Sequence, residues 1–224
     1  MVTLTVGKFL SDVNGRVGYW YGPEVPRDAE RTKRLLLEAA TDEFAEHGLD
    51  GTTVERIAAR AGVNKERLYN YFGDKSTLFS KVLATELGRI DDDVPLLIRS
   101  LDDVADFAAR SYDYVAEHRR LSRLVIWEGL ADSGDLPEEA VRSELYRGKV
   151  ATVVNAQRAG IITDSIAAAD LLFLVLSLSS WWASAPQIAR MISSAEDVAD
   201  VRVGRRASVA EAARRLAAPH RTAL

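Results

Sequence analysis

The sequence predicts an all-α protein, and two observations support this. From Arg27 onward, apolar residues recur at helical spacing, and almost no segment alternates as a strand does. Turn signals separate the helical segments, and no repeat of solenoid length is present. We therefore expect a core built from packed helices.

Composition narrows the class of protein. The 224 residues are 47% hydrophobic and 28% charged, close to the averages of folded globular chains, which excludes wholesale disorder. Cysteine is absent, so disulfide frameworks and cysteine-ligated metal sites are excluded, and the cytoplasm is the expected compartment. The net charge of −4 offers no general attraction to nucleic acid or to anionic membranes, so such binding needs a local patch.

Residues 1–26 form an extension ahead of the helical pattern. They contain the turn signal Asn14-Gly15 and end with two prolines, a pattern that fits both a small hairpin and a loose arm. An arm can place Lys8, Arg16 or Arg27 in a DNA minor groove, whereas a poorly ordered tail is the commoner outcome at a terminus.

The helices follow in order. In the first, Leu36, Ala39, Ala40 and Phe44 share one apolar stripe, and Gly48 stands just past its end. The expected helical segments are 28–47, 52–61, 64–72, 74–90, 102–118, 121–130, 137–159, 167–192 and 203–217. The clearest breaks between them are Asp91-Asp92-Asp93 with Pro95, Asp132-Ser133-Gly134, and Gly160.

One segment requires a membrane check. Between Asp170 and Arg190 lie 19 consecutive uncharged residues, 171–189, which approaches the length that spans a bilayer. Four serines, Pro186 and Gln187 interrupt this stretch. We interpret it as a buried helix, with a membrane span as the minor alternative.

The segment 52–72 predicts two short helices joined by a tight turn. Thr52 to Glu55 has the pattern of a capping box, in which the Thr52 hydroxyl accepts from the Glu55 amide and starts the first helix. Gly62 tolerates the left-handed conformation of a sharp turn, and Asn64 is a preferred N-cap for the second helix. Together these features predict a helix-turn-helix.

The second short helix presents a polar face. Leu68 and Phe72 are spaced to face inward, which leaves the polar residues outside. Cationic side chains on such a face can donate to guanine edges, an asparagine can pair with adenine, and tyrosine hydroxyls can reach phosphates. From Arg56 to Lys75, five basic residues outnumber two acidic ones. The candidate DNA contacts are Thr53, Asn64, Lys65, Glu66, Arg67, Tyr69, Asn70, Tyr71 and Lys75, the last at a helix start that favours a phosphate.

These residues resemble the signature of a known family. The pattern Thr53-Val54-x-x-Ile57-Ala58-x-x-Ala61-Gly62-Val63-x-x-x-x-Leu68-Tyr69-x-Tyr71-Phe72-x-x-Lys75-x-x-Leu78 is similar to the DNA-binding signature of the TetR transcriptional regulators. The resemblance covers about residues 31–79. It implies an N-terminal three-helix DNA-binding domain at 27–75 and a larger helical effector-binding and dimerisation domain at 76–224.

The resemblance also implies a mechanism. It implies a homodimer on a pseudo-palindromic double-stranded DNA operator, usually repressing, that is released when a small-molecule effector enters the C-terminal domain. The two recognition helices must lie about 34 Å apart to enter successive major grooves, so an effector that shifts helix 74–90 would spoil the spacing. Asn64 and Glu66 depart from the family pattern, in which a serine or threonine and a small residue are common. The operator sequence therefore does not carry over.

Aromatic residues populate the central helices of the C-terminal region, where they fit ordinary core packing as well as a ligand pocket. Glu128 fits either a polar anchor or an exposed side chain. The candidate effector-pocket residues are Phe107, Tyr112, Trp127, Glu128, Tyr146 and Phe173. The run 171–176 is apolar on all sides, so a helix there must be buried either against a second subunit or within its own subunit. The candidate dimer-interface residues are Leu174, Leu178, Trp181, Trp182, Val209, Ala213 and Leu216.

An enzymatic function finds little support. The three histidines are scattered, and the sequence has no paired-histidine metal spacing, Gly-rich phosphate loop or nucleophile elbow. The aspartates at 91–93 and 102–103 fit helix caps better than a cation site. We expect no catalytic residue, cofactor, metal or membrane partner. The alternative to a DNA-binding regulator is an all-helical small-molecule carrier or interaction protein whose two short helices are merely structural.

Overall fold

The computed structural model describes residues 27–131, 139–193 and 198–219, and these residues form helices without a strand. The all-α prediction is therefore confirmed, and the expectations for residues 1–26 lie outside the described residues. The helices, in chain order, are α1 (Arg27–His47), α2 (Val54–Ala61), α3 (Lys65–Phe72), α4 (Lys75–Asp93), α5 (Leu101–Glu117), α6 (Arg119–Leu130), α7 (Glu139–Arg158), α8 (Ala168–Ser184), α9 (Pro186–Ile192) and α10 (Val198–Ala217).

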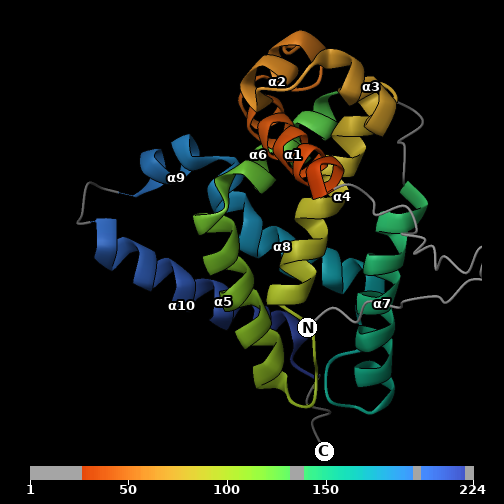
Figure 1. Cartoon of the computed structure of the whole chain (residues 1–224). Helices are drawn as coiled ribbons and strands as arrows, with labels where there is room; N and C mark the ends of the chain where they lie inside the picture. Colours follow the sequence, from red (N-terminus) through yellow and green to blue (C-terminus); the bar gives the residue numbers. More distant parts are fainter. Residues whose placement is uncertain (1–26, 132–138, 194–197, 220–224) are drawn as a thin grey trace, which may run out of the picture.

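The helices form two groups. α1, α2 and α3 lie together at one end of the molecule, and α4 runs from them into the larger group (Figure 1). α1 contacts α2, α3, α4 and α6. In the larger group α5 packs against both α8 and α10, while α7 packs against α8 and α4. The N-terminal helices therefore rest on the C-terminal ones through α4 and α6.

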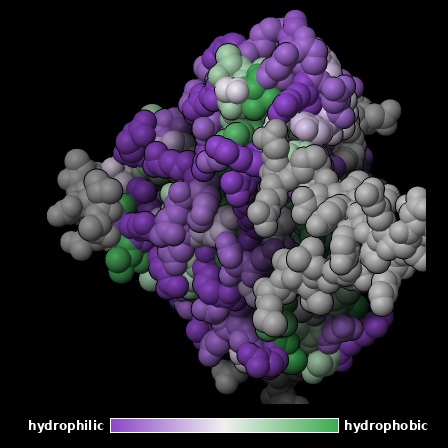
Figure 2. Space-filling view, in the orientation of Figure 1, coloured by the Kyte–Doolittle hydropathy of each residue, from purple (hydrophilic) through white to green (hydrophobic). Residues whose placement is uncertain are grey.

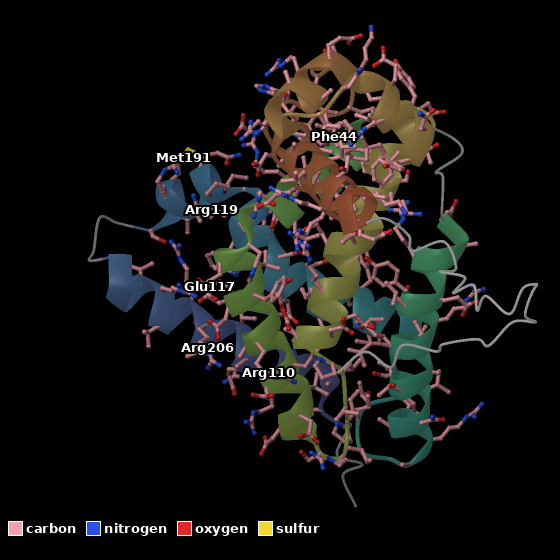
Figure 3. The ribbon with its side chains drawn as sticks, in the orientation of Figure 1. Phe44, Arg110, Glu117, Arg119, Met191 and Arg206 are labelled. Atoms are coloured by element: carbon pink, nitrogen blue, oxygen red, sulfur yellow. The ribbon has the colours of Figure 1, made fainter. Side chains whose placement is uncertain are left out.

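Phe44 fills the centre of the N-terminal group (Figure 3). Its fully buried ring meets the ring of Phe79 of α4 edge-on, with 5.1 Å between the centroids. Leu36 of α1, Ile57 of α2 and Leu68 of α3 are also fully buried. Each such burial stabilises the fold by roughly 1.5 to 3 kcal/mol. The apolar stripe predicted for the first helix is therefore confirmed.

Hydrophilic residues cover most of the surface seen in Figure 2, including the end that carries α2 and α3. Beneath the surface, one cluster of buried apolar residues continues from α1 through α4 into α5, α8 and α10. Because the two groups of helices share this core, a change of packing in the larger group can reach the smaller one.

The long helix expected at 167–192 is divided in the structure. α8 ends at Ser184, α9 begins at Pro186, and the two helices differ in direction by 84°. Proline lacks a backbone N–H and its ring clashes with a preceding helical turn, so it can begin a helix but not continue one. Among the described residues, no single helix has the length and hydropathy to cross a membrane, although this bent pair has them jointly.

The two aspartate clusters have different roles. α4 continues through Asp93 and ends before Pro95, so the expected break is present, although the helix extends three residues beyond its expected end at Ile90. In the second cluster, Asp103 accepts from the backbone amides of Arg99 and Ser100 at 2.7 and 2.8 Å. The Ser100 hydroxyl accepts in return from the Asp103 amide at 3.3 Å. This capping box starts α5, as expected for an acidic cluster beside a helix end.

Candidate nucleic-acid interface and ligand cavity

Thr53, rather than Thr52, caps α2. The Thr53 backbone is extended, and its hydroxyl accepts from the Arg56 amide at 3.3 Å. Thr52 is buried, and its hydroxyl donates to the Glu43 carboxylate at 2.8 Å. The capping box predicted from Thr52 to Glu55 is therefore wrong by one residue, because a buried hydroxyl needs a partner and Glu43 of α1 supplies it.

The turn between α2 and α3 forms as predicted. Gly62 has a φ of 64°, in the left-handed region that favours glycine. The amides of Gly62 and Val63 donate to carbonyls in the last turn of α2 at 3.1 and 3.0 Å. Asn64 then caps α3, its side chain accepting from the Glu66 amide at 3.1 Å. The two helices form a helix-turn-helix in which α3 is the second helix.

α3 has one buried and one exposed face. Leu68 and Phe72 are buried and hold α3 against α1, α2 and α4. Tyr69 is 49% exposed although it is a large aromatic residue. The exposed residues of α3 include Lys65, Glu66, Arg67, Tyr69 and Asn70. This face offers the donors and acceptors that contact base edges and phosphates.

Tyr71 and Lys75 are half-buried at the edge of this face. Tyr71 packs against the core. Lys75 donates to the Thr52 carbonyl at 3.1 Å, which ties the start of α4 to the residue before the α2 cap. Asp74 caps α4 by accepting from the Thr77 amide at 2.7 Å, and this hydrogen bond lowers the pKa of the Asp74 carboxyl. An amide at the start of α4 and the Lys75 ammonium are thus both hydrogen-bonded within the protein.

A buried carboxylate of α1 binds two arginines of α2. Glu43 is 5% exposed and lies 3.1 Å from both Arg60 Nη1 and Arg56 Nη2. Burial acts to raise the pKa of Glu43, but hydrogen bonds from Thr52 and Arg60 and the charge of Arg56 outweigh it and hold the pKa below its ordinary value. Two of the five basic residues counted between Arg56 and Lys75 therefore join α2 to α1.

α6 binds the C-terminal end of α1. Arg123 donates to the backbone carbonyls of Ala45 and Glu46, the latter at 3.1 Å. Arg120 pairs with Asp42 at 2.6 Å. The last carbonyls of a helix lack intrahelical partners and carry partial negative charge, so an arginine placed there stabilises the helix end.

Trp127 belongs to this same contact between α1 and α6. Its indole Nε1 lies 3.4 Å from the Ala45 carbonyl, to which it donates, and its ring lies against Gly48. The sequence assigned Trp127 to an effector pocket, but the structure places it against the end of α1 instead. The physical reason is that Trp127 lies on the face of α6 that packs against α1, whereas the opposite face of α6 lines a ligand-sized cavity.

A cavity of about 590 Å³ lies among α4, α5, α6, α7 and α8. This volume is typical of sites for small molecules. Phe107, Tyr146 and Phe173, three of the residues predicted for an effector pocket, line it. Lys149 of α7 and Asp91 of α4 form an ion pair on its wall. Burial lowers the pKa of the Lys149 ammonium.

Tyr112 and Glu128 lie outside this cavity. Tyr112 lines a second cavity of about 620 Å³ among α5, α8, α9 and α10. Trp182 shares that cavity, with its ring centroid 5.0 Å from the guanidinium carbon of Arg205. Glu128 of α6 pairs with the buried Arg142 of α7 at 2.8 Å. Glu128 therefore forms an ion pair between two helices, which differs from both the polar anchor and the exposed side chain that the sequence suggested.

The α8 residues assigned to a dimer interface are partly open to solvent. Trp181 and Leu174 are 62% and 42% exposed. Leu178 and Trp182 are half-buried and pack against the core of the protomer. α8 therefore carries apolar side chains that remain exposed among the residues that the structure describes.

The α10 residues assigned to the same interface are covered within the protomer. Val209 and Ala213 are 2% and 0% exposed, and Leu216 is half-buried against the core. The cause is that α10 lies along α5. Arg206 reaches from α10 toward α5 and pairs with Asp113 at 2.6 Å (Figure 3). Assigning the Val209 and Ala213 side chains to contacts with a second subunit is thus incorrect for this arrangement of helices.

Four residues of the cavity and of the contact between α1 and α6 were not predicted from the sequence: Ser111, Ser122, Arg123 and Lys149. A serine within an apolar helical stripe, such as Ser111, is a local sequence signal for a polar group inside the core. Arg123 and Lys149 have partners 77 and 58 residues away in the chain, so no local signal marks them.

Two family models match the chain. The model for bacterial regulatory proteins of the tetR family matches residues 36–82. The model for the tetracyclin repressor-like C-terminal domain matches residues 103–215. The HTH-type transcriptional repressor SCO4008 of Streptomyces coelicolor is 41% identical over 191 residues, which cover 85% of this chain and 97% of the relative.

Solved structures share the fold. The putative transcriptional regulator SCO4942 of Streptomyces coelicolor has a TM-score of 0.69 and 28% identity, covering 83% of this chain and 98% of its own. FadR of Bacillus subtilis, solved in complex with stearoyl-CoA, has a TM-score of 0.60 and 16% identity, covering 80% of this chain and 96% of its own, a likeness of fold alone. With both domain models matched and a repressor this similar over most of its length, the chain belongs to the TetR family of DNA-binding transcriptional regulators.

Proposed function

We propose that this regulator is a repressor that binds a pseudo-palindromic operator as a homodimer. In this proposal, residues 27–75 bind DNA and residues 76–224 bind the effector and the second subunit. The name of the 41% identical relative, a transcriptional repressor, supports the direction of regulation. As a binding protein that acts on bacterial DNA, it would work in the cytoplasm and without catalysis.

The observation that carries the proposal is the polar outer face of α3. Lys65, Arg67 and Asn70 are exposed together, while Leu68 fixes the helix from behind. Arginine and lysine are suited to guanine edges and asparagine to adenine, whereas the Tyr69 hydroxyl suits a phosphate. In this proposal α3 enters the major groove, where the Glu66 carboxylate accepts from a cytosine amino group or repels a nearby phosphate.

The remaining candidate contacts flank α3. Thr53 and Asn64 cap the two short helices, so their role is to orient the amides and side chains that approach DNA. Tyr71 and Lys75 stand at the edge of the face, where a phosphate would meet the phenol and the ammonium. Because phosphate contacts carry no base preference, these residues would set affinity rather than sequence.

Two helices connect the cavity with the helix-turn-helix. α4 lines the cavity with Leu87, Ile90 and Asp91, while Lys75 at its other end binds the Thr52 carbonyl. A ligand that prefers a shifted position of α4 would move the recognition helices of a dimer away from the spacing of one DNA turn, about 34 Å.

α6 provides the second connection. Leu121, Ser122 and Val125 line the cavity, while Arg120 and Arg123 hold α1 on the other side. A ligand that displaces α6 would therefore act on α1 directly.

In the dimer, we propose that a second copy covers the exposed Leu174 and Trp181 of α8, since exposed apolar surface of this kind marks interaction sites.

The test is to sequence the genomic DNA fragments that the purified protein retains and to measure its mass in solution. We expect enrichment of one inverted repeat with half-sites one helical turn apart, and the mass of a dimer. Retention of random fragments, or of none, would instead favour the carrier protein whose short helices are structural. The substitutions Trp181→Ser and Leu174→Ser should yield a monomer that no longer selects the repeat.

A further inference from the structure

Serines line the cavity among α4 to α8, and they differ in whether their hydroxyls have a hydrogen-bond partner. Four of them, on α8, donate to backbone carbonyls four residues earlier, at distances between 2.8 and 3.2 Å. These satisfied serines are Ser177, Ser179, Ser180 and Ser184. Their hydroxyls are occupied by the helix itself, so they add little polarity to the cavity.

Ser111 of α5 and Ser122 of α6 also line the cavity, but their hydroxyls are unsatisfied. The two residues are 2% and 6% exposed, and neither hydroxyl has a hydrogen-bond partner within the part of the chain that the structure describes. A buried hydroxyl without a partner destabilises a fold, so each such group calls for a reason. A ligand in the cavity would supply the missing partner for both.

The charges on the cavity wall cancel. Asp91 and Lys149 are the charged side chains among its described lining residues, and they pair with each other. The rest of the wall is largely apolar, with Phe107, Leu121 and Leu172 among its residues. A charged ligand in such a cavity would lose its hydration without gaining an unpaired counter-charge.

We propose that the cavity binds an uncharged, mainly apolar molecule that carries a hydroxyl or carbonyl oxygen, and that Ser111 and Ser122 hold this oxygen. The inference rests on the proposed ligand-responsive function and specifies its ligand class. A carbonyl oxygen can accept a hydrogen bond from a serine hydroxyl, and a ligand hydroxyl can both donate to it and accept from it. The apolar body of the ligand displaces water from the cavity wall.

Three probes with one chain and different charge test the ligand class. Decan-1-ol, decanoate and decylammonium are titrated separately into the full chain by isothermal titration calorimetry. We expect the alcohol to bind at least about tenfold more tightly than either ion. An ion that binds as tightly as the alcohol, or the absence of binding by the alcohol, would overturn the proposal.

Serine variants test the two hydroxyls. Ser111→Ala and Ser122→Ala should each weaken decan-1-ol binding about five- to tenfold, the fold-change of one hydrogen bond. Their melting temperatures should stay level or rise, because an unsatisfied buried hydroxyl is removed. Ser177→Ala, in the same cavity but already bonded to the Phe173 carbonyl, is the matched control and should change affinity less than twofold. Equal losses in all three variants would count against the assignment.

Asp91→Asn tests the charge balance without relying on the serines. This variant leaves Lys149 unpaired, so decanoate should become the preferred probe. An unchanged order of affinities among the three probes would overturn the argument from charge.

Release of DNA is measured separately, by mobility shift with an operator fragment. Selective binding of decan-1-ol without release supports the ligand class and refutes only ligand-induced release. Release by decan-1-ol that is insensitive to Ser111→Ala and Ser122→Ala refutes the ligand class.

Discussion

The ring of Trp127 occupies the space that a side chain on Gly48 would need. A Cβ atom built on Gly48 would lie 2.7 Å from two ring carbons of Trp127, closer than van der Waals contact permits. Gly48 also has a φ of 72°, in the left-handed region. The end of α1 and the last turn of α6 therefore approach each other only because position 48 lacks a side chain.

Gly48→Ala should lower the free energy of unfolding by about 2 to 5 kcal/mol. Left-handed backbone costs a residue with a Cβ about 1 to 2 kcal/mol, and overpacking adds about 1 to 3. Urea unfolding measures the change. Gly62→Ala is the control, since its φ is 64° but no atom lies within 4 Å of the new Cβ. It should cost only the backbone part, about 1 to 2 kcal/mol. Equal losses at both positions would contradict a role for Trp127.

Arg123→Ala should lower the free energy of unfolding by about 1 kcal/mol, because the Ala45 and Glu46 carbonyls lose their donor. Arg147→Ala is the comparison, as its exposed pair with Glu144 on α7 should contribute less than about 0.5 kcal/mol. If α6 conveys ligand binding to α1, Arg123→Ala should also raise the ligand concentration that releases DNA. An Arg123 variant as stable and as responsive as the Arg147 variant would refute both roles.

Glu43 should make stability depend on pH. Because its pKa is lowered on folding, the carboxylate contributes stability above the unfolded pKa of about 4.5, and this contribution is lost as pH falls through the lower folded value. Glu43→Gln should therefore be destabilising at pH 7, with a smaller difference from the wild type at pH 3. Urea unfolding at both pH values tests this. A difference that is the same or larger at pH 3 would show that the charge of Glu43 is not the cause.

Arg67→Ala should relax base preference. If Arg67 donates to a base edge, its loss should cost about 1 to 3 kcal/mol for the preferred base at one position in each half-site and little elsewhere. Binding to a set of single-base operator variants measures this. A uniform loss across all sequences would assign Arg67 to a phosphate instead.

Lys75→Ala should weaken binding to all operator sequences alike. A phosphate contact contributes through counterion release, so the slope of log affinity against log salt should fall by about one in magnitude. The variant also loses the hydrogen bond to the Thr52 carbonyl, so its stability is measured in parallel. An unchanged salt slope together with reduced stability would limit Lys75 to its structural role.

Local signals predicted the helix-turn-helix almost completely. Gly62 has the left-handed conformation and Asn64 the capping role expected of them, because both depend on residues within one turn of the chain. The capping box failed because Thr52 bonds to Glu43, nine residues earlier on another helix. The break before Pro186 had a local signal, the proline itself, which the uncharged run of 171–189 obscured.

The sequence by itself determined the helical class, the two short helices and the polar outer face of α3, since each depends on spacing within a few residues. Only the tertiary structure decided which side chains line the cavity. Phe107 lines it while Tyr112 does not, although both are buried aromatic residues of one helix. It also decided that Trp127 supports α1 and that α10 covers α5. The physical reason is that the burial of a side chain depends on which other helix packs against its face. Those packing contacts are made between residues far apart in the chain, so no local pattern predicts them.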